Sequence, residues 1–324
     1  MSIVRSLIAG LAAALAAWPS CVLAEDYPAR AVRIVVPQSA GGATDTFARA
    51  IGQKLSERWK QPVVIENRAG AAGVIGTESV AKAPADGYTL LVTYEGSQAI
   101  NPSLYEKLPF DSIRDFEPIA TIAVTPFLLI VGPQTKANTL QEFLALARAN
   151  PDKLNYGSAG NGSVNHLLGE MLKVEAEIRI THVPYKGAPQ AISDVIGGHL
   201  DSAFASAPSV IASVQQGLVR ALAVSSGQRV AISPETPTIA EGGVKDFDVN
   251  PWWGIFGPAG LSPSIVSKIN SDVAEILQEP DFQELLAKQG AMPLASSPEQ
   301  FRALLAKDIA KWAKAVKAAG IKMN

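Results

Sequence analysis

The stretch IVVPQSAGGATD, residues 34–45, decides the fold of this chain. An apolar run ends at Pro37, two adjacent glycines follow, and apolar residues then recur every four positions from Phe47. This pattern predicts a strand, a glycine turn and a helix near 44–59. Such a turn can bind an anion, because free backbone N–H groups and the positive end of the helix dipole meet there. The alternative that the stretch leaves open is an ordinary turn capped by Thr44.

Residues 1–24 have the features of a secretory signal peptide. Arg5 gives a positively charged start, an apolar stretch follows, and small residues lead up to Ala24. We therefore predict cleavage after Ala24 and an exported chain that begins at Glu25. A lipoprotein modified at Cys21 has less support, because a bulky tryptophan and a rigid proline stand shortly before that cysteine.

The composition of the exported chain excludes several classes of protein. Cys21 is the only cysteine, so export leaves no thiol for a disulfide or a metal site. Removing Arg5 from the 28 basic residues leaves 27 against 30 acidic ones, and a net charge of −3 offers no basic surface to nucleic acid or anionic membranes. No later apolar run approaches the roughly 20 residues that cross a bilayer. The exported chain has more residues than one hydrophobic core usually organises, so we expect two domains.

Short β-branched runs alternate with helical patterns, which is typical of α/β proteins. The predicted strands are 32–36, 63–65, 89–93, 127–131, 154–156, 178–183, 202–205 and 219–224, and predicted helices lie near 44–59, 139–149 and 189–196. The proline-rich passage 233–260 predicts a loop that carries Trp252 and Trp253. These tryptophans form either a wall of a ligand site or the packing at a domain junction.

A second glycine turn spans residues 157–163, between a predicted strand and a helix that Ser163 is placed to cap. The presence of two such turns favours anion binding over a merely flexible loop. A nucleotide site has no support, because no Gly-Lys-Ser/Thr follows and the glycines are not in dinucleotide order. Ser158 lacks the Gly-x-Ser-x-Gly elbow of hydrolases.

The three histidines and one lysine are the remaining candidate site residues. His166, His182 and His199 are dispersed without metal-ligand spacing, so we predict no metal site and expect structural hydrogen bonds from each. His166 lies near the second glycine turn, so the alternative to a structural role is that it contacts a ligand or positions a residue that does. Lys186, beside Tyr185, either neutralises an anionic ligand or is a solvated surface lysine.

Several ordered motifs resemble one known family. They are YP at 27–28, residues 32–45, QPVVIENR at 61–68, ADGYTLL at 85–91, AINP at 99–102 and VPYKG at 183–187. In this order they are similar to the Bug-type, TctC-like solute-binding proteins of tripartite tricarboxylate transporters. The resemblance covers nearly all of the chain after residue 24.

The resemblance implies a periplasmic binding protein and no enzyme. The implied fold is α/β, with two domains of the type II-like class, each a mixed sheet flanked by helices, and two crossovers at the hinge. The first domain would combine 25–125 with 249–324, and the second would be 126–248. The chain is then expected to be a periplasmic monomer without a cofactor, which closes on a small carboxylate-bearing ligand and delivers it to membrane subunits of the transporter.

The resemblance also places the two glycine turns on opposite sides of a ligand cleft. The matching positions on one side are Ser39, Ala40, Gly41, Gly42, Thr44 and Asp45. Those on the other side are Ser158, Gly160, Gly162, Ser163 and His166, with Tyr185, Lys186 and Asp201 nearby. We expect Asp45 to accept hydrogen bonds from the turn rather than to touch an anion, because like charges repel.

The sequence departs from the family pattern at Gln38, Ser39 and the segment 94–98. If Glu95 faces the ligand, a buried carboxylate disfavours a simple C4 or C6 dicarboxylate. Glu95 and Gln98 would then recognise a cationic, amide or aromatic portion of a monocarboxylate. The alternative is that Glu95 points to solvent or pairs with a nearby lysine or arginine.

Three function classes remain open at this point. The first is capture of an organic acid for a transporter, and the second is a sensory binding protein that reports to a membrane receptor. A periplasmic hydrolase that uses Ser158 has the least support.

Overall fold

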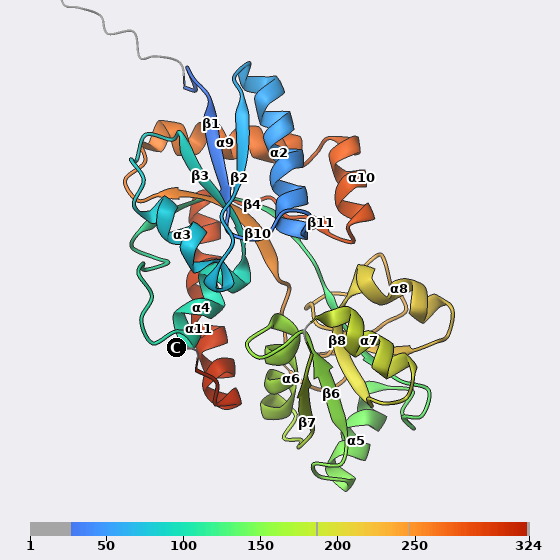
Figure 1. Ribbon diagram of the computed structural model, residues 1–324. Coiled ribbons are helices and arrows are strands. Elements are labelled where there is room, and N and C mark those ends of the chain that lie inside the picture. The colour runs from blue at the N-terminus through green and yellow to red at the C-terminus, as the bar shows by residue number, and fades with distance from the viewer. Residues whose placement is uncertain (1–26, 186, 246, 323–324) are drawn as a thin grey trace, which may run out of the picture.

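A computed structural model describes residues 27–185, 187–245 and 247–322. The predicted signal peptide and Lys186 lie outside the described residues. Figure 1 shows two lobes, each built around its own sheet. Both sheets mix parallel and antiparallel strands, which confirms the predicted α/β class. Within the described ranges, no helix is long and apolar enough to cross a membrane.

The first lobe contains a six-stranded sheet in the order β11-β4-β10-β3-β1-β2. Its strands are β1 (Val32–Val36), β2 (Val63–Asn67), β3 (Thr89–Tyr94), β4 (Phe116–Val124), β10 (Trp252–Pro258) and β11 (Met292–Pro293). Its helices are α2 (Ala43–Trp59), η2 (Ala71–Gly73), α3 (Val74–Ala81), η3 (Gly96–Ile100), α4 (Asn101–Leu104), α9 (Pro263–Ile276), α10 (Pro280–Lys288) and α11 (Pro298–Ala319). Strand β1 runs parallel to β2 and β3, whereas β10 is antiparallel to β3 and β4.

The second lobe contains a five-stranded sheet in the order β7-β6-β8-β5-β9. Its strands are β5 (Phe127–Val131), β6 (Asn155–Ser158), β7 (Thr181–Pro184), β8 (Ser202–Ser206) and β9 (Arg220–Val224). Its helices are α5 (Leu140–Ala149), α6 (Val164–Glu175), α7 (Ala188–Ile196) and α8 (Ala207–Gln215). The predicted cap of α6 is present, because the Ser163 hydroxyl accepts a hydrogen bond from the His166 N–H.

Two connections join the lobes. The chain leaves the first sheet at the end of β4 and enters the second at β5, and it returns at the start of β10. The connections lie side by side, because the Thr125 N–H donates to the Pro251 carbonyl at 2.9 Å. Helix α11 also packs on both lobes, against β4 and α4 in the first and α6 in the second (Figure 1).

The prediction of a loop over 233–260 is wrong at its end. Residues Trp252–Pro258 form the central strand β10, between β4 and β3. Both faces of the strand are buried, so its sequence lacks the alternation of a half-exposed strand. Gly254 allows a close contact here, since a Cβ at this position would stand 2.3 Å from the Phe301 ring.

Candidate functional site

A pocket of about 370 Å3 lies between the two lobes. Its residues come from the end of β3, from η3 and α4, from both connections, and from the glycine turn before α6. The lining residues are Ala72, Tyr94, Gly96, Ile100, Asn101, Leu104, Phe127, Asn161, Gly162, Ser163, Val164, Asn165, Pro251 and Trp253. The volume is in the range of small-molecule sites. Parallel strands of both sheets end toward this pocket, as expected for ligand sites in open α/β sheets.

The start of α2 keeps free backbone donors. Its N-cap residue is Gly42, and no side chain caps it. Thr44 is not the cap, because its hydroxyl instead accepts a hydrogen bond from Trp253 Nε1 at 3.0 Å. The N–H groups of residues 43–45 are therefore the unpaired donors that open every helix. The expected cap by Thr44 is therefore wrong, and anion binding at this turn stays a prediction.

Asp45 holds the first glycine turn, as we expected. Its carboxylate accepts hydrogen bonds from the Gly41 N–H at 2.9 Å, from Asn67 Nδ2 at 3.0 Å and from Arg49 Nε at 3.0 Å. Burial opposes ionisation, but these hydrogen bonds prevail and lower the pKa of Asp45. The Gly41 N–H is consequently used inside the turn. Residues 39–43 lie exposed beside the pocket and do not line it.

The second glycine turn reaches the pocket through Gly162 and Ser163. The Ser158 hydroxyl accepts a hydrogen bond from the Gly160 N–H at 3.0 Å, and Ser163 Oγ donates to the Gly160 carbonyl at 2.7 Å. Ser158 and His166 are buried and do not line this pocket, so they support the turn from below. Full burial of Ser158 also leaves no access for a substrate to a serine nucleophile.

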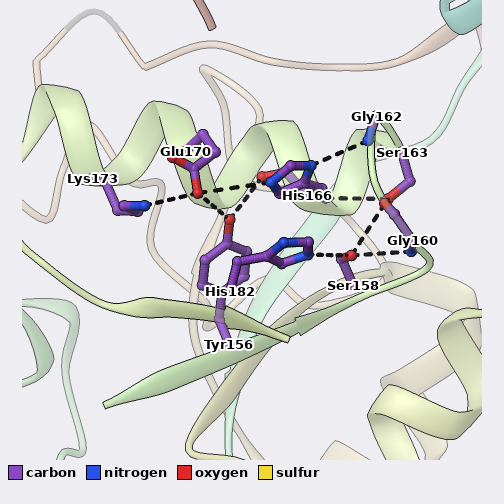
Figure 2. Close-up of polar contacts among 9 residues, drawn as sticks. All are labelled: Tyr156, Ser158, Gly160, Gly162, Ser163, His166, Glu170, Lys173 and His182. Carbon is purple, nitrogen blue, oxygen red and sulfur yellow. Dashed lines mark hydrogen bonds and ion pairs between the residues drawn. The ribbon is translucent and has the colours of Figure 1, made fainter. Parts of the chain in front are cut away.

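Two stacked histidines lie behind this turn (Figure 2). Their ring centroids are 3.7 Å apart, and His182 Nε2 lies 2.6 Å from Ser158 Oγ. The Gly162 N–H donates to His166 Nδ1 at 3.1 Å. Burial lowers the pKa of His166, and burial together with His166 lowers the pKa of His182 to about 4, so both rings are neutral at pH 7.

Trp252 and Trp253 have different roles: one packs in the core and the other lines the pocket. Trp252 is buried, and its Nε1 donates to Asp308 at 2.8 Å in the core of the first lobe. Trp253 lines the pocket, packs edge-to-face on Phe47 and bonds to Thr44. Trp253 therefore connects the start of α2 to the pocket wall.

The structure places Glu95 away from the pocket. Its side chain is fully buried against α11, where Oε1 accepts a hydrogen bond from Trp312 Nε1 at 2.6 Å and lies 3.6 Å from Lys311 Nζ. The expectation that Glu95 faces a ligand is wrong, and pairing with a nearby lysine is confirmed. The cause is local: residues 96–100 form a π-helical turn instead of a loop, and the turn directs Glu95 inward.

Gln38 and Gln98 keep unpaired amide atoms. Gln38 Nε2 donates to Ser97 Oγ at 3.0 Å, but its Oε1 has no partner among the described residues. Gln98 is fully buried and neither of its amide atoms has a partner within the described ranges. Neither glutamine lines the pocket, so their contact with a ligand stays a prediction.

Asp201 and the Tyr185 phenol are not part of the pocket, contrary to expectation. Asp201 precedes β8, and its carboxylate accepts a hydrogen bond from the Asn155 N–H at the start of β6. Because β6 and β8 are parallel, Asp201 lies where both strands begin, at the opposite end of β6 from Ser158. The Tyr185 hydroxyl donates to Asp194 of α7 instead of facing the pocket. Lys186 lies outside the described residues.

Sequence reasoning missed most of the pocket wall. Tyr94, Asn101, Asn161 and Asn165 line it and were not selected, although each lies within or beside a quoted motif. One signal was available: a glycine, Gly96, lies two residues after Tyr94, and a Cβ at Gly96 would stand 2.3 Å from the Tyr94 ring. In the part of the chain that the structure describes, no group of three His, Cys, Asp or Glu residues could hold a metal ion.

Comparisons with known proteins agree with this architecture. Residues 47–321 match the family described as "Tripartite tricarboxylate transporter family receptor". The chain is 35% identical to protein BugT of Bordetella pertussis over 326 residues, with both chains covered fully. A solved structure of a Rhodopseudomonas palustris protein with adipate is 36% identical with a TM-score of 0.76, covering 92% of this chain and 99% of that one. MatC of the same species with bound malate is 31% identical with a TM-score of 0.72, covering 90% and 100%.

These matches extend over nearly the whole chain. A further solved structure, of the periplasmic binding protein BugD, is 34% identical with a TM-score of 0.72, covering 92% of this chain and 100% of that one. The chain belongs to the receptor family of the tripartite tricarboxylate transporters, and it is a solute-binding protein.

Proposed function

We propose that this protein captures a small carboxylate-bearing molecule in the pocket between its lobes. The observation that carries the proposal is a pocket whose lining residues, among those described, carry no charge. The start of α6 lines this pocket, and Trp253 of the pocket wall is hydrogen-bonded to Thr44 at the start of α2. Helix N-termini stabilise negative charge through free N–H groups and the helix dipole. The free donors are the amides of residues 43–45 on α2 and of residues 164 and 165 on α6.

Dicarboxylates are the first ligands to test. The burial of Glu95 against α11 removes one carboxylate that would have repelled a second ligand carboxylate. Relatives have been solved with adipate and with malate, a C6 and a C4 dicarboxylate. The two helix starts, one on each lobe, fit a ligand with an anionic group at each end.

Closure of the lobes on the ligand is the second part of the proposal. The division of the chain into residues 25–125 with 249–324 and residues 126–248 puts the domain boundaries in the two connections, and a hinge of a few connecting residues supports rigid-body closure. We further propose export through the signal peptide at 1–24 and delivery to membrane subunits of a transporter. Deletion of the gene should then abolish uptake of the ligand, whereas loss of a response with normal uptake would indicate sensing.

A thermal-shift panel tests the binding step. At a ligand concentration of 100 times Kd, binding to the native state adds about 2.7 kcal/mol. For a chain of about 300 residues that corresponds to a rise in Tm of roughly 4 °C. Adipate, malate, monocarboxylates and their neutral amides form the panel, and a carboxylate should raise Tm where its amide does not.

A matched pair of variants locates the site. Val164→Trp fills the pocket at the first residue of α6, whereas Val174→Trp changes the same helix at a position that is 53% exposed and away from the pocket. Val164→Trp should abolish the ligand-induced shift, and Val174→Trp should keep it. If both variants keep the shift, the ligand binds elsewhere.

A further inference from the structure

The glycine turn before α6 separates two pockets. Asn161 lines the pocket between the lobes and also a second, open pocket behind the turn. The second pocket is lined by His166, His182, Glu170 and Lys173 together with the end of α11 and Lys322. The histidine stack therefore supports the ligand side of the turn from behind.

His166 takes one of the backbone donors of the turn. The Gly160 N–H is bound by Ser158 Oγ, the Gly162 N–H by His166 Nδ1, and the Ser163 N–H by the Gly160 carbonyl. These three donors are thus paired within the protein. The N–H groups of residues 159, 161, 164 and 165 have no acceptor among the described residues.

The hydrogen bonds define the protonation of His166. Its Nδ1 accepts from the Gly162 N–H, so the proton of the neutral ring must be on Nε2. A protonated His166 would carry a proton on Nδ1 and could no longer accept this bond. His182 stacks on His166 at 3.7 Å, and two imidazolium rings at that distance would repel.

The charged groups around the stack come from α6 and from the segment after α11. Glu170 and Lys173 of α6 form an ion pair at 2.9 Å, and Glu170 Oε1 also accepts from the Tyr156 hydroxyl of β6 at 2.6 Å. Glu170 lies 3.8 Å from His166 Nε2, beyond hydrogen-bond distance. Lys322, after α11, is the further cation in the second pocket and pairs with Glu106.

We propose that His166 and His182 are positioning residues for ligand binding, and that His166 must be neutral to aim the free amides of the turn at the ligand. This inference rests on the proposed function, because the ligand is the carboxylate bound in the pocket between the lobes. Neither ring touches the ligand: each acts through the turn. Protonation of His166 breaks its bond to Gly162 and loosens the turn.

Two variants of His166 separate a positioning role from a space-filling one. His166→Asn keeps an acceptor, since its Oδ1 can replace Nδ1, whereas His166→Leu keeps volume without an acceptor. With adipate and malate as probes, we expect His166→Leu to weaken binding by about tenfold, the size of one lost hydrogen bond. His166→Asn should stay within about threefold of the unaltered protein, since the acceptor remains. His182→Gln and His182→Leu repeat the comparison for Ser158 Oγ.

The dependence of ligand affinity on pH distinguishes the proposed role of His166 from a purely structural one. As pH falls from 7.5 to 4, the affinity of the unaltered protein should fall relative to that of His166→Asn. The ratio of the two affinities cancels titration of the ligand itself. The window extends to pH 4 because burial lowers the pKa of His166. Long-range 1H–15N spectra at pH 6.5 should show His166 protonated on Nε2 alone. Equal affinities for His166→Asn and His166→Leu, a constant ratio, or a proton on Nδ1 would overturn the inference. An unaltered protein that binds no carboxylate would instead defeat the proposed function.

Discussion

Replacing Glu95 by glutamine should stabilise this protein at neutral and alkaline pH. Glu95 and Asp308 share one cation, Lys311, whose Nζ is 2.7 Å from Asp308 but 3.6 Å from Glu95. Burial raises the pKa of Glu95 to about 8, with Asp308 adding to the effect and Lys311 opposing it. The ionised form of Glu95 is therefore unfavourable in the folded state, although a lysine lies nearby.

The size of the effect follows from the two pKa values. The folded protein holds the Glu95 proton up to about pH 8, while the unfolded chain releases it near 4.5. The stability that this proton provides is complete below pH 4.5 and is lost as pH rises through 8. The difference of 3.5 units sets an upper limit of about 5 kcal/mol, and we expect about 2 kcal/mol at pH 8 once the structure relaxes.

Urea unfolding of both proteins between pH 5 and 8.5 measures this effect, with fluorescence of the buried Trp252 and Trp312 as the signal. Glu95→Gln should match the unaltered protein at pH 5 and exceed it increasingly up to pH 8. Its glutamine can still accept the hydrogen bond from Trp312. Ligand preference should not change, because Glu95 is outside the pocket.

Lys311→Met is the control, because it leaves Asp308 with no cation at this site. It should destabilise the protein by about 3 kcal/mol, as expected when one partner of a buried pair is removed. If Glu95→Gln is less stable than the unaltered protein at pH 8, Glu95 is ionised in the folded state and the reasoning is refuted.

Three further predictions concern residues around the pocket. Gln98→Met removes a buried amide with no described partner, so it should raise Tm of the free protein, and weaker adipate or malate binding in calorimetry would identify Gln98 as a ligand contact. Gly96→Ala pushes on the Tyr94 ring and should cost about 1–3 kcal/mol in urea unfolding; an unchanged midpoint would contradict the close contact. Asp45→Asn should cost about 1–3 kcal/mol at pH 7, and less below pH 4, since the lowered pKa of Asp45 means that its contribution is lost in acid; a cost independent of pH would exclude ionic stabilisation.

Local patterns predicted the elements that carry their own signals. The apolar run 32–36 and the cap residue Ser163 mark strand β1 and the start of α6 where the structure has them. Strand β10 was missed because it is buried on both faces and follows a proline-rich segment. Burial on two faces erases the alternation by which a strand is recognised.

The pocket was harder to predict than the turns that flank it. Glu95 was misplaced because the direction of its side chain depends on a π-helical turn and on Trp312 and Lys311, which are more than 200 residues away in sequence. Ser158 and His182 are likewise brought together by the pairing of β6 with β7, which no spacing in the sequence reveals.

We propose that uncharged backbone donors of two helix starts hold a carboxylate between the lobes. Isothermal titration of the purified protein with adipate, malate and their diamides distinguishes this mode of binding from others. We expect one site per chain for a dicarboxylate, no measurable binding of the matching diamide, and loss of the site in Val164→Trp but not in Val174→Trp. Equal affinity for acid and amide, or binding that survives Val164→Trp, would contradict it.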